Sequence, residues 1–364
     1  MVSEFLYSQP VKIWFGDGSF QKLDEVLDSL DVKRCVLVCG RHFGPTARAL
    51  MEADERICAV FSDVEQNPQL SGVEATVALA RENRADAVVG IGGGSSIDTA
   101  KFAAASALGE DQPLDYYRGK PFPASRLKII AVPTTAGTGS EVTQVSVISH
   151  GTEKKTINNP AFMPSAAIVD PVLSSTVPPR TTMNTGLDAL AHALEGYWSK
   201  NHQPISDLMA IEAVRTVLNN LETAYRDGGN MEARRAMAYA SLLGGLSFAL
   251  PKTAASHACS YPLSEDYHLP HGEACAFTLD SLVRINADER LEVLCHRAGL
   301  CGTDELAERI KVLKELGGLR CRLSELGEVD IDKLAADCAA HPLMNNNPVK
   351  LDAAALKKMF EALK

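Results

Sequence analysis

The sequence predicts an N-terminal α/β domain with a parallel, doubly wound sheet, followed by an all-helical C-terminal domain. Short apolar runs closed by glycine or proline alternate with helical stretches over the first half of the 364 residues. Such continuous apolar runs are typical of strands buried on both faces. Beyond about residue 178 these runs become rare, and Ala, Leu, Glu and Lys dominate. We therefore expect two domains, 1–178 and 179–364.

The first domain justifies the α/β prediction element by element. Residues 35–39, 85–91 and 127–132 are compact apolar runs, and each is expected to form a strand. Residues 70–83 carry apolar side chains at helical spacing. Strands that alternate with helices along the chain predict a parallel sheet with a helix after each strand.

The second domain lacks strand signals. Residues 212–226, 231–250 and 304–316 place apolar side chains at intervals of three and four, which predicts helices with one buried face.

The charge of the chain excludes several partners. Lys and Arg number 36 and Asp and Glu number 46, so the net charge is 36 − 46 = −10. This balance argues against nucleic acid or an anionic membrane as a partner, although a pocket for a small anion can still be locally basic. No run approaches the roughly 20 apolar residues of a membrane helix. None of the nine cysteines forms a C-x-x-C pair, so we expect reduced thiols and a cytoplasmic protein.

A glycine-rich turn follows the second predicted strand and opens a predicted helix. Glycines at Gly92, Gly93 and Gly94 allow close approach of the backbone to phosphate oxygens, and the helix N-terminus stabilises negative charge. The alternative is an ordinary tight turn capped by Ser95. The spacing is not G-x-G-x-x-G, so a Rossmann fingerprint is not predicted.

A second polar turn, at residues 133–143, also follows a predicted strand. It is dense in hydroxyl and small side chains, which suit a phosphate or a ribose. An ordinary polar loop is the alternative.

Metal-ligand residue types cluster in the helical half. Asp188 and His192 are four residues apart, which places both on one face of a helix. Their neighbours are Ala and Leu, and a buried carboxylate beside an imidazole is costly unless it is paired or bound to a metal. With His257 and His271 they offer one carboxylate and three imidazoles to a divalent ion. A simple Asp–His hydrogen bond is the alternative. The role of His268 stays open. We interpret the five other histidines as structural: His42, His150, His202, His296 and His341.

Taken in order, these motifs resemble the iron-type (group III) alcohol dehydrogenases, which have a dehydroquinate synthase-like fold. The resemblance rests on Gly93-Gly94-Ser95-x-x-Asp98, on Pro133-Thr134-Thr135-x-Gly137-Thr138-x-x-Glu141, and on Asp188-x-x-x-His192 followed by His257 and His271. It implies a homodimer with a nicotinamide cofactor and Fe²⁺, for which Zn²⁺ or Mn²⁺ can substitute. Such a metal would polarise a carbonyl while hydride arrives from the nicotinamide.

The resemblance also implies roles for individual residues. Asp188, His192, His257 and His271 would be the metal ligands. Gly94 and Ser95 would meet the pyrophosphate, and Gly93 and Asp98 of the same motif would also belong to the cofactor site. The remaining cofactor residues would be Thr134, Thr135, Thr138 and Thr143 on the nicotinamide-ribose side, with Asn67 and Lys155 also near the dinucleotide.

One departure from the family concerns the cofactor. Many members carry an acidic residue after the first of these strands, where it would bind the ribose 2′-hydroxyl of NAD. This chain has Gly40 and Arg41 there, which should admit a 2′-phosphate. We therefore expect NADPH to be accepted and even preferred over NADH. Alternatively, Arg41 faces solvent and NADH is still used.

Two further departures concern the substrate. Tyr261 replaces a histidine of many members and is either a proton donor to the nascent alkoxide or a packing residue. Lys252 and Thr253 stand where small residues are usual, which suits an anionic aldehyde, unless Lys252 simply reaches solvent. Together with His257, Ser260 and the residues up to Leu263, they resemble the phosphonoacetaldehyde reductases. The alternatives are another small aldehyde (sulfoacetaldehyde, succinic semialdehyde or an alkanal) or, more distantly, a lyase of the dehydroquinate synthase type. Residues 345–347, all Asn, either reach the same pocket or cap a turn.

Overall fold

The computed structural model describes residues 4–364. It divides into an α/β unit, residues 8–135 and 139–174, and a helical unit, residues 4–7, 136–138 and 175–364. Each unit is described by itself below.

The α/β unit is built on a sheet of six parallel strands in the order β1-β8-β5-β4-β2-β3. The three predicted strands form part of its centre. The outer strands β1 and β3, and β8, which separates β1 from β5, are short and were not predicted. The strands are β1 (Lys12–Phe15), β2 (Cys35–Cys39), β3 (Ile57–Phe61), β4 (Ala87–Gly92), β5 (Lys128–Pro133) and β8 (Ala166–Val169).

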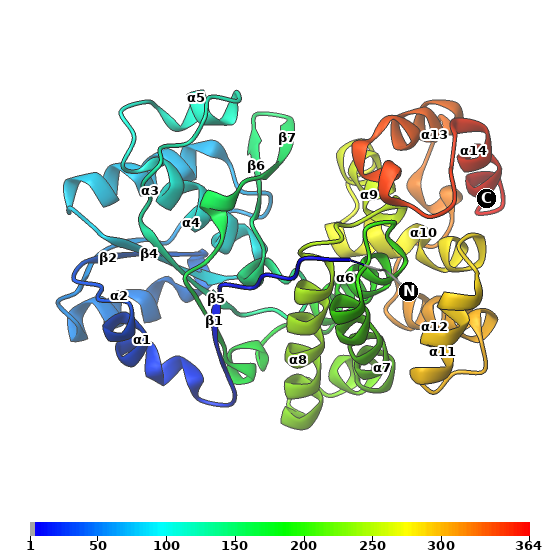
Figure 1. Cartoon of the computed structure of the whole chain (residues 1–364), viewed down its shortest axis with the longest axis horizontal. Coiled ribbons are helices and arrows are strands. Elements are labelled where there is room, and N and C mark those ends of the chain that lie inside the picture. Colours follow the sequence, from blue (N-terminus) through cyan, green and yellow to red (C-terminus); the bar gives the residue numbers. More distant parts are fainter. Residues whose placement is uncertain (1–3) are drawn as a thin grey trace. The chain divides into compact units, whose positions relative to one another are not determined.

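Helices cover both faces of this sheet, which confirms the doubly wound prediction (Figure 1). Cys35 and Leu37 of β2 pack in one apolar cluster with α1 (Leu23–Ser29) and α2 (Gly44–Ala53). Val36 and Val38 point to the other face, where two further helices pack. These are α3 (Leu70–Glu82) and α4 (Gly94–Ser106).

The strand order creates a crevice at one position of the sheet. β2 and β4 are neighbours. The chain after β2 continues to β3 at one edge of the sheet, whereas the chain after β4 continues to β5 in the opposite direction. Ligands of open parallel sheets bind at such a switch point, beyond the carboxyl ends of the strands. Gly40 follows β2 and Gly93 follows β4, so the predicted cofactor turns lie at this position.

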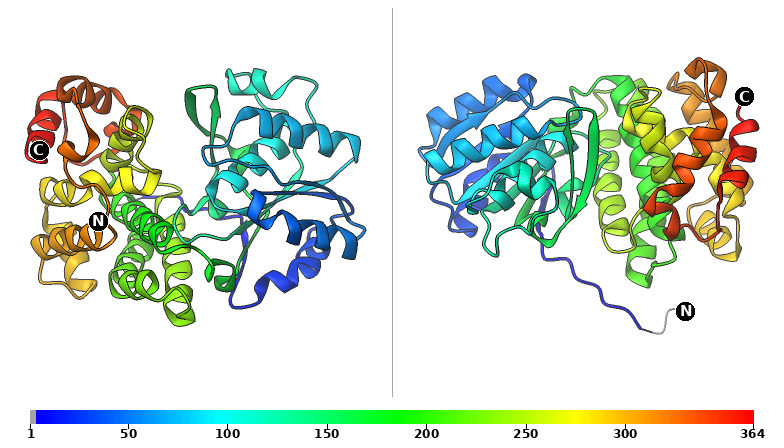
Figure 2. Two further views of the ribbon diagram at one scale, coloured as in Figure 1. Left: turned by 180° about the vertical axis from the view of Figure 1, so that it is seen from behind. Right: turned by 90° about the horizontal axis from the view of Figure 1, so that it is seen from above.

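A separate antiparallel hairpin, β6 (Val145–His150) with β7 (Glu153–Asn158), packs on α4 (Figure 2). Ser146 Oγ donates to the carbonyl of Asp98, 2.9 Å away, and ties the hairpin to the helix. The short helix α5 (Pro113–Tyr117) contacts α3 and α4.

The helical unit surrounds one continuous apolar core. The predicted helices are present as α7, α8 and α12, and α7 starts earlier than predicted because Gln203 and Ser206 cap it at Pro204. No helix among residues 4–364 is long and apolar enough to cross a membrane. The α-helices of residues 175–364 are α6 (Pro179–Trp198), α7 (Pro204–Arg226), α8 (Met231–Phe248), α9 (Ala255–Glu265), α10 (His271–Ile285), α11 (Glu289–Arg297), α12 (Thr303–Leu316), α13 (Ile331–Ala340) and α14 (Ala353–Glu361).

Candidate metal centre and cofactor site

Three helices of the helical unit bring the predicted metal ligands together. α6 carries Asp188 and His192 one turn apart, and both are buried. His257 lies in the first turn of α9 and His271 is the first residue of α10. Asp188 Oδ1 lies 3.7 Å from His257 Nε2 and 3.8 Å from His271 Nε2.

The hydrogen bonds of two imidazoles direct their lone pairs into the cluster. His192 Nδ1 lies 3.2 Å from the carbonyl oxygen of Gly137, and His257 Nδ1 contacts the carboxylate of Glu195. Both partners only accept, so each Nδ1 carries a proton, and each ring presents a lone pair at Nε2 when that nitrogen is unprotonated. The two Nε2 atoms are 3.0 Å apart. Facing lone pairs repel unless a cation or a proton lies between them.

The cluster also holds an unpaired anionic oxygen. Asp188 Oδ1 is buried without a hydrogen-bond partner, an arrangement that is costly unless a cation compensates it. The cluster thus offers one carboxylate and two imidazole lone pairs that point into it, with His271 beside them. This donor set suits a divalent transition metal. The residues present therefore fit the metal that the motifs imply.

Charge and burial act in opposite directions on these groups. Burial lowers the pKa of His192 to about 4, against the pull of Asp188. Burial also disfavours the charged form of His257, but Cys275 and Glu195 raise its pKa well above the usual range. The neighbouring histidines hold the pKa of Asp188 below its usual range despite burial. A proton on His257 is thus the natural competitor of a metal ion.

Two glycines allow the backbone approaches that the site needs. A Cβ at Gly272 would lie 2.0 Å from the carbonyl oxygen of Asn184, so only glycine lets the start of α10 meet α6. A Cβ at Gly137 would lie 2.7 Å from Thr185, so glycine also lets this carbonyl reach His192.

Several residues of the site were not predicted. Glu195 accepts from the amide of Ser256, 2.6 Å away, as well as from His257. The Phe248 ring stacks on His192 with centroids 4.2 Å apart, and Cys275 lies next to His271. The sequence signal for Glu195 is its spacing, because it follows Asp188 and His192 on the same face of α6.

The predicted substrate residues lie in the same unit. The amide of Lys252 donates to the carbonyl of Phe248, 2.8 Å away, directly after the helix whose end covers His192. Lys252 has a left-handed backbone with φ 72°, and its Nζ contacts the Ala249 carbonyl at 3.2 Å. Burial lowers the pKa of Lys252.

Tyr261 has a histidine as its direct neighbour. The Tyr261 ring stacks on His341 with centroids 4.3 Å apart. Asn346 Nδ2 donates to the carbonyl of Thr253, 2.8 Å away, whereas Asn347 pairs with Asn286 in the core. One of the three asparagines therefore reaches this region.

In the α/β unit, the glycine turn has the geometry of an anion site. Gly92 has φ 151°, and a Cβ there would lie 2.4 Å from Ser96 Oγ. Gly93 is the N-cap of α4 and no side chain caps it, so the amides of Gly94 and Ser95 are available to a ligand. Thr135 Oγ1 would contact a Cβ at Gly93 at 3.4 Å, so the two predicted turns adjoin. The amide of Thr134 donates to the carbonyl of Gly92.

Two predicted cofactor residues, Asp98 and Thr143, bond to α4 and its neighbouring segments. Asp98 is buried and accepts from Ser140 Oγ at 2.6 Å and from the Val147 amide at 2.9 Å. Thr143 is buried against Lys101 Nζ at 3.3 Å. Their side chains hold α4 and the second polar turn together.

The structure separates Lys155 from Asn67. Asn67 Oδ1 accepts from Lys154 Nζ at 3.2 Å, and Asn67 has a left-handed backbone with φ 58°. Lys155 Nζ lies over the Tyr117 ring, 4.6 Å from its centroid. Adjacent residues of a strand face opposite ways, so only Lys154 points toward Asn67. Thr138 lies in residues 136–138, which group with the helical unit.

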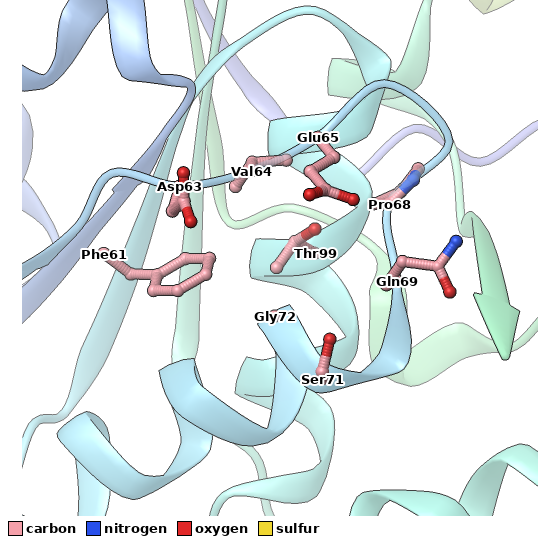
Figure 3. Close-up of a pocket in the computed structure, with 9 residues that line it drawn as sticks. All are labelled: Phe61, Asp63, Val64, Glu65, Pro68, Gln69, Ser71, Gly72 and Thr99. Carbon is pink, nitrogen blue, oxygen red and sulfur yellow. The ribbon is translucent and has the colours of Figure 1, made fainter. Parts of the chain in front are cut away.

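A pocket adjoins the end of β3 and the start of α3 (Figure 3). Asp63 and Glu65 line it, and Asp63 also pairs with Arg41. A Cβ at Gly40 would meet the carbonyl oxygen of Val64 at 3.6 Å, an ordinary contact. Arg41 is therefore engaged by a carboxylate, and position 40 has space for a Cβ atom. The lining residues are Phe61, Asp63, Val64, Glu65, Pro68, Gln69, Ser71, Gly72 and Thr99.

Comparison with known families gives two consecutive matches. Residues 10–171 match the model of the iron-containing alcohol dehydrogenases. Residues 182–363 match the model of the C-terminal part of the Fe-containing alcohol dehydrogenase family.

Individual relatives agree with these matches. Alcohol dehydrogenase 4 of Saccharomyces cerevisiae is 31% identical over 98% of both chains. Long-chain-alcohol dehydrogenase 1 of Geobacillus thermodenitrificans is 42% identical, over 60% of this chain and 56% of that enzyme. The crystal structure of sulfoacetaldehyde reductase from Bifidobacterium kashiwanohense in complex with NAD⁺ superposes with a TM-score of 0.94, at 40% identity, covering 99% of this chain and 98% of that one.

Proposed function

The chain belongs to the iron-containing alcohol dehydrogenase family, and from this premise we propose that it reduces a two-carbon aldehyde that ends in an oxyanion. Phosphonoacetaldehyde, giving 2-hydroxyethylphosphonate, is the substrate that the sequence favours. Sulfoacetaldehyde is the second candidate, because a sulfoacetaldehyde reductase is 40% identical over 99% of this chain.

The position of Lys252 carries this proposal. Its amide is bonded to the carbonyl of Phe248, whose ring stacks on His192. Only Phe248 therefore separates Lys252 from the candidate metal ligand His192 in this chain of contacts. Its left-handed backbone is strained, and such strain concentrates at functional sites. Burial disfavours the charged ammonium, and a bound oxyanion would restore it.

The neighbours of Lys252 extend the anion site. Thr253 is buried and offers a hydroxyl, while Asn346 holds its carbonyl. One ammonium and one hydroxyl suit a tetrahedral oxyanion, to which both can donate. An uncharged alkanal would leave the ammonium bonded to the Ala249 carbonyl but without an anionic partner.

The reaction divides between bound groups and side chains. A divalent ion supplies Lewis acidity at the carbonyl oxygen, and the dinucleotide supplies the hydride. Asp188, His192, His257 and His271 would hold the ion, and Lys252 orients the substrate. Tyr261 donates the proton that converts the product alkoxide to the alcohol, and His341 fixes the plane of its ring by stacking.

For the dinucleotide, we propose that both NADH and NADPH are accepted. The α4 N-terminus takes the pyrophosphate, and Gly40 leaves room beside it for the ribose. Arg41 favours NADPH, because its guanidinium can leave Asp63 and pair with the 2′-phosphate. The carboxylates of Asp63 and Glu65 favour NADH, because they repel that phosphate. Solvent screens exposed pairs such as Arg41–Asp63 and leaves them weak, so the exchange is feasible.

Two further predictions accompany this function. We expect a homodimer, on the resemblance described above, and a cytoplasmic location, on the cysteine pattern. Sedimentation of the purified protein tests the first.

The experiment compares kcat/KM for phosphonoacetaldehyde, sulfoacetaldehyde, succinic semialdehyde and propanal in the Fe²⁺-loaded protein. We expect at least about a hundredfold preference for the two-carbon oxyanions over propanal, or roughly 2.7 kcal/mol of transition-state binding. Lys252→Met should raise KM for the anionic aldehydes far more than for propanal, because it removes the ammonium.

The matched control is Lys311→Met, at an exposed position of α12. Equal kcat/KM values for charged and uncharged aldehydes would overturn the substrate proposal. If the charged aldehydes are preferred, the ratio of kcat/KM for phosphonoacetaldehyde to that for sulfoacetaldehyde decides between the two candidates.

A further inference from the structure

A thiol lies among the metal donors. Cys275 follows His271 by one turn of α10, so both side chains lie on the same face of this helix. One ligand atom from each of Asp188, His257, His271 and Cys275 lies within 4.8 Å of the other three. Cys275 is fully buried, and its Sγ is 3.8 Å from His271 Nε2.

The spacings of this group, to which His192 adds a further donor beside His257, approach those between neighbouring ligands of one zinc ion. Zinc bonds of about 2.0–2.3 Å place neighbouring ligand atoms about 3.3–3.5 Å apart. The measured separations are 3.7 Å from Asp188 to His257, 3.8 Å from Asp188 to His271 and 3.8 Å from His271 to Cys275. Shifts of a few tenths of an ångström close each of these edges.

A second observation indicates that a cation would be stabilised between these four side chains. Asp188 Oδ1 is buried and has no hydrogen-bond partner, although it lies against two imidazoles of the group. A neighbouring bond ties the backbone at this residue to α9, because Ser256 Oγ donates to the Cys275 carbonyl at 2.7 Å. Ser256 precedes His257, so this bond keeps the backbone of Cys275 close to that ligand.

From this geometry we propose that Cys275 is an additional metal ligand, and that it biases the centre toward zinc over iron. The four imidazole and carboxylate donors together carry one negative charge, from Asp188. A metal-bound cysteine is a thiolate, so Cys275 adds a second charge and balances a divalent ion. Thiolate is also the softer donor and favours zinc-class ions over iron(II). The inference concerns the metal alone and does not rest on the identity of the aldehyde.

Cobalt(II) substitution tests the proposal directly. A thiolate bound to cobalt(II) gives an intense charge-transfer band in the near ultraviolet, which imidazole and carboxylate ligands do not give. We expect this band in the cobalt-loaded protein and its loss in Cys275→Ala, with the weaker visible ligand-field bands retained. The control is Cys295→Ala, because Cys295 is also buried but lies on α11 outside the donor group.

Metal affinity gives an independent measurement. In chelator competition, Cys275→Ser should weaken zinc binding about 10–100-fold and iron(II) binding much less. Far-ultraviolet circular dichroism of both variants establishes that they are folded. Absence of the charge-transfer band in the parent protein, or its persistence in Cys275→Ala, would overturn the proposal. Equal weakening of zinc and iron binding would overturn the metal bias.

Discussion

Glu195 illustrates at the scale of one residue how a buried carboxylate prepares a neighbouring ligand. It contacts His257 Nδ1 and accepts from the Ser256 amide at 2.6 Å, so the imidazole presents Nε2 to the cluster. Such outer partners of a metal-bound histidine fix its tautomer and orientation.

We predict that Glu195→Gln weakens metal binding about 10–100-fold, because the amide leaves the tautomer of His257 undetermined. Chelator competition followed by metal analysis measures the effect. Glu212→Gln is the control, since Glu212 pairs with Arg215 on the surface of α7. Unchanged affinity in Glu195→Gln would show that the carboxylate does not orient His257.

Asp63 and Gly40 make cofactor choice a residue-scale question. Asp63→Asn should shift kcat/KM toward NADPH severalfold, because it removes a carboxylate from the pocket and releases Arg41. Gly40→Asp should shift the ratio toward NADH, because a new carboxylate there accepts from the ribose 2′-hydroxyl. Steady-state rates with both dinucleotides measure the ratio. Ratios that do not move in either variant would exclude this pocket from cofactor selection.

At the scale of elements, a buried polar network joins α4 to the second polar turn and to the hairpin. Lys101 is completely buried and donates to Ser140 Oγ at 2.7 Å and to the Val145 carbonyl at 2.8 Å. Burial lowers its pKa to about 8, against the pull of Asp98. The glycine turn that begins α4 is thus held by a lysine whose charge is costly.

This lysine predicts a pH dependence of stability. Between pH 8 and 10.5 the unfolded chain binds a proton at Lys101 that the folded protein does not. Deprotonation of Lys101 therefore increases the free energy of unfolding as the pH rises, by up to about 3 kcal/mol. Urea unfolding of the parent protein and of Lys101→Met, compared from pH 7 to 10.5, isolates the effect. A difference between the two proteins that stays constant with pH would contradict the shifted pKa.

The elements also show how far sequence patterns extend. β2, β4 and β5 were predictable because each is a continuous apolar run, whereas β1 and β8 have only four residues each and lack that length signal. The four candidate metal ligands could be named from the spacing on α6 and from the order of the motifs that resemble the family. The neighbours His341 and Cys275 could not, because only the tertiary fold brings His341 to Tyr261 and a thiol to His271.

For the whole molecule, the division into two units predicts separate responses to ligands. Metal removal should destabilise the helical unit, because all candidate ligands lie within it. Metal at a hundred times its Kd stabilises by about 2.7 kcal/mol, so a chelator should lower this transition by about 5–10 °C.

Differential scanning calorimetry, with and without chelator, measures this shift. NADH should instead raise the transition of the α/β unit, which contains the glycine turn and the pocket. Asp188→Ala is the control and should show neither bound metal nor a response to chelator. A parent protein whose unfolding ignores the chelator would contradict the assignment of the centre.

The four predicted ligands differ in their access to solvent, and this sets the order in which an incoming ion is captured. The side chains of Asp188, His192 and His257 are 3–6% exposed, whereas that of His271 is 40% exposed. Because water reaches His271 more readily than the three buried donors, we expect His271 to be the last ligand to bind an incoming ion and the first to release it. His271 substitutions should therefore accelerate metal exchange more than they disturb the fold.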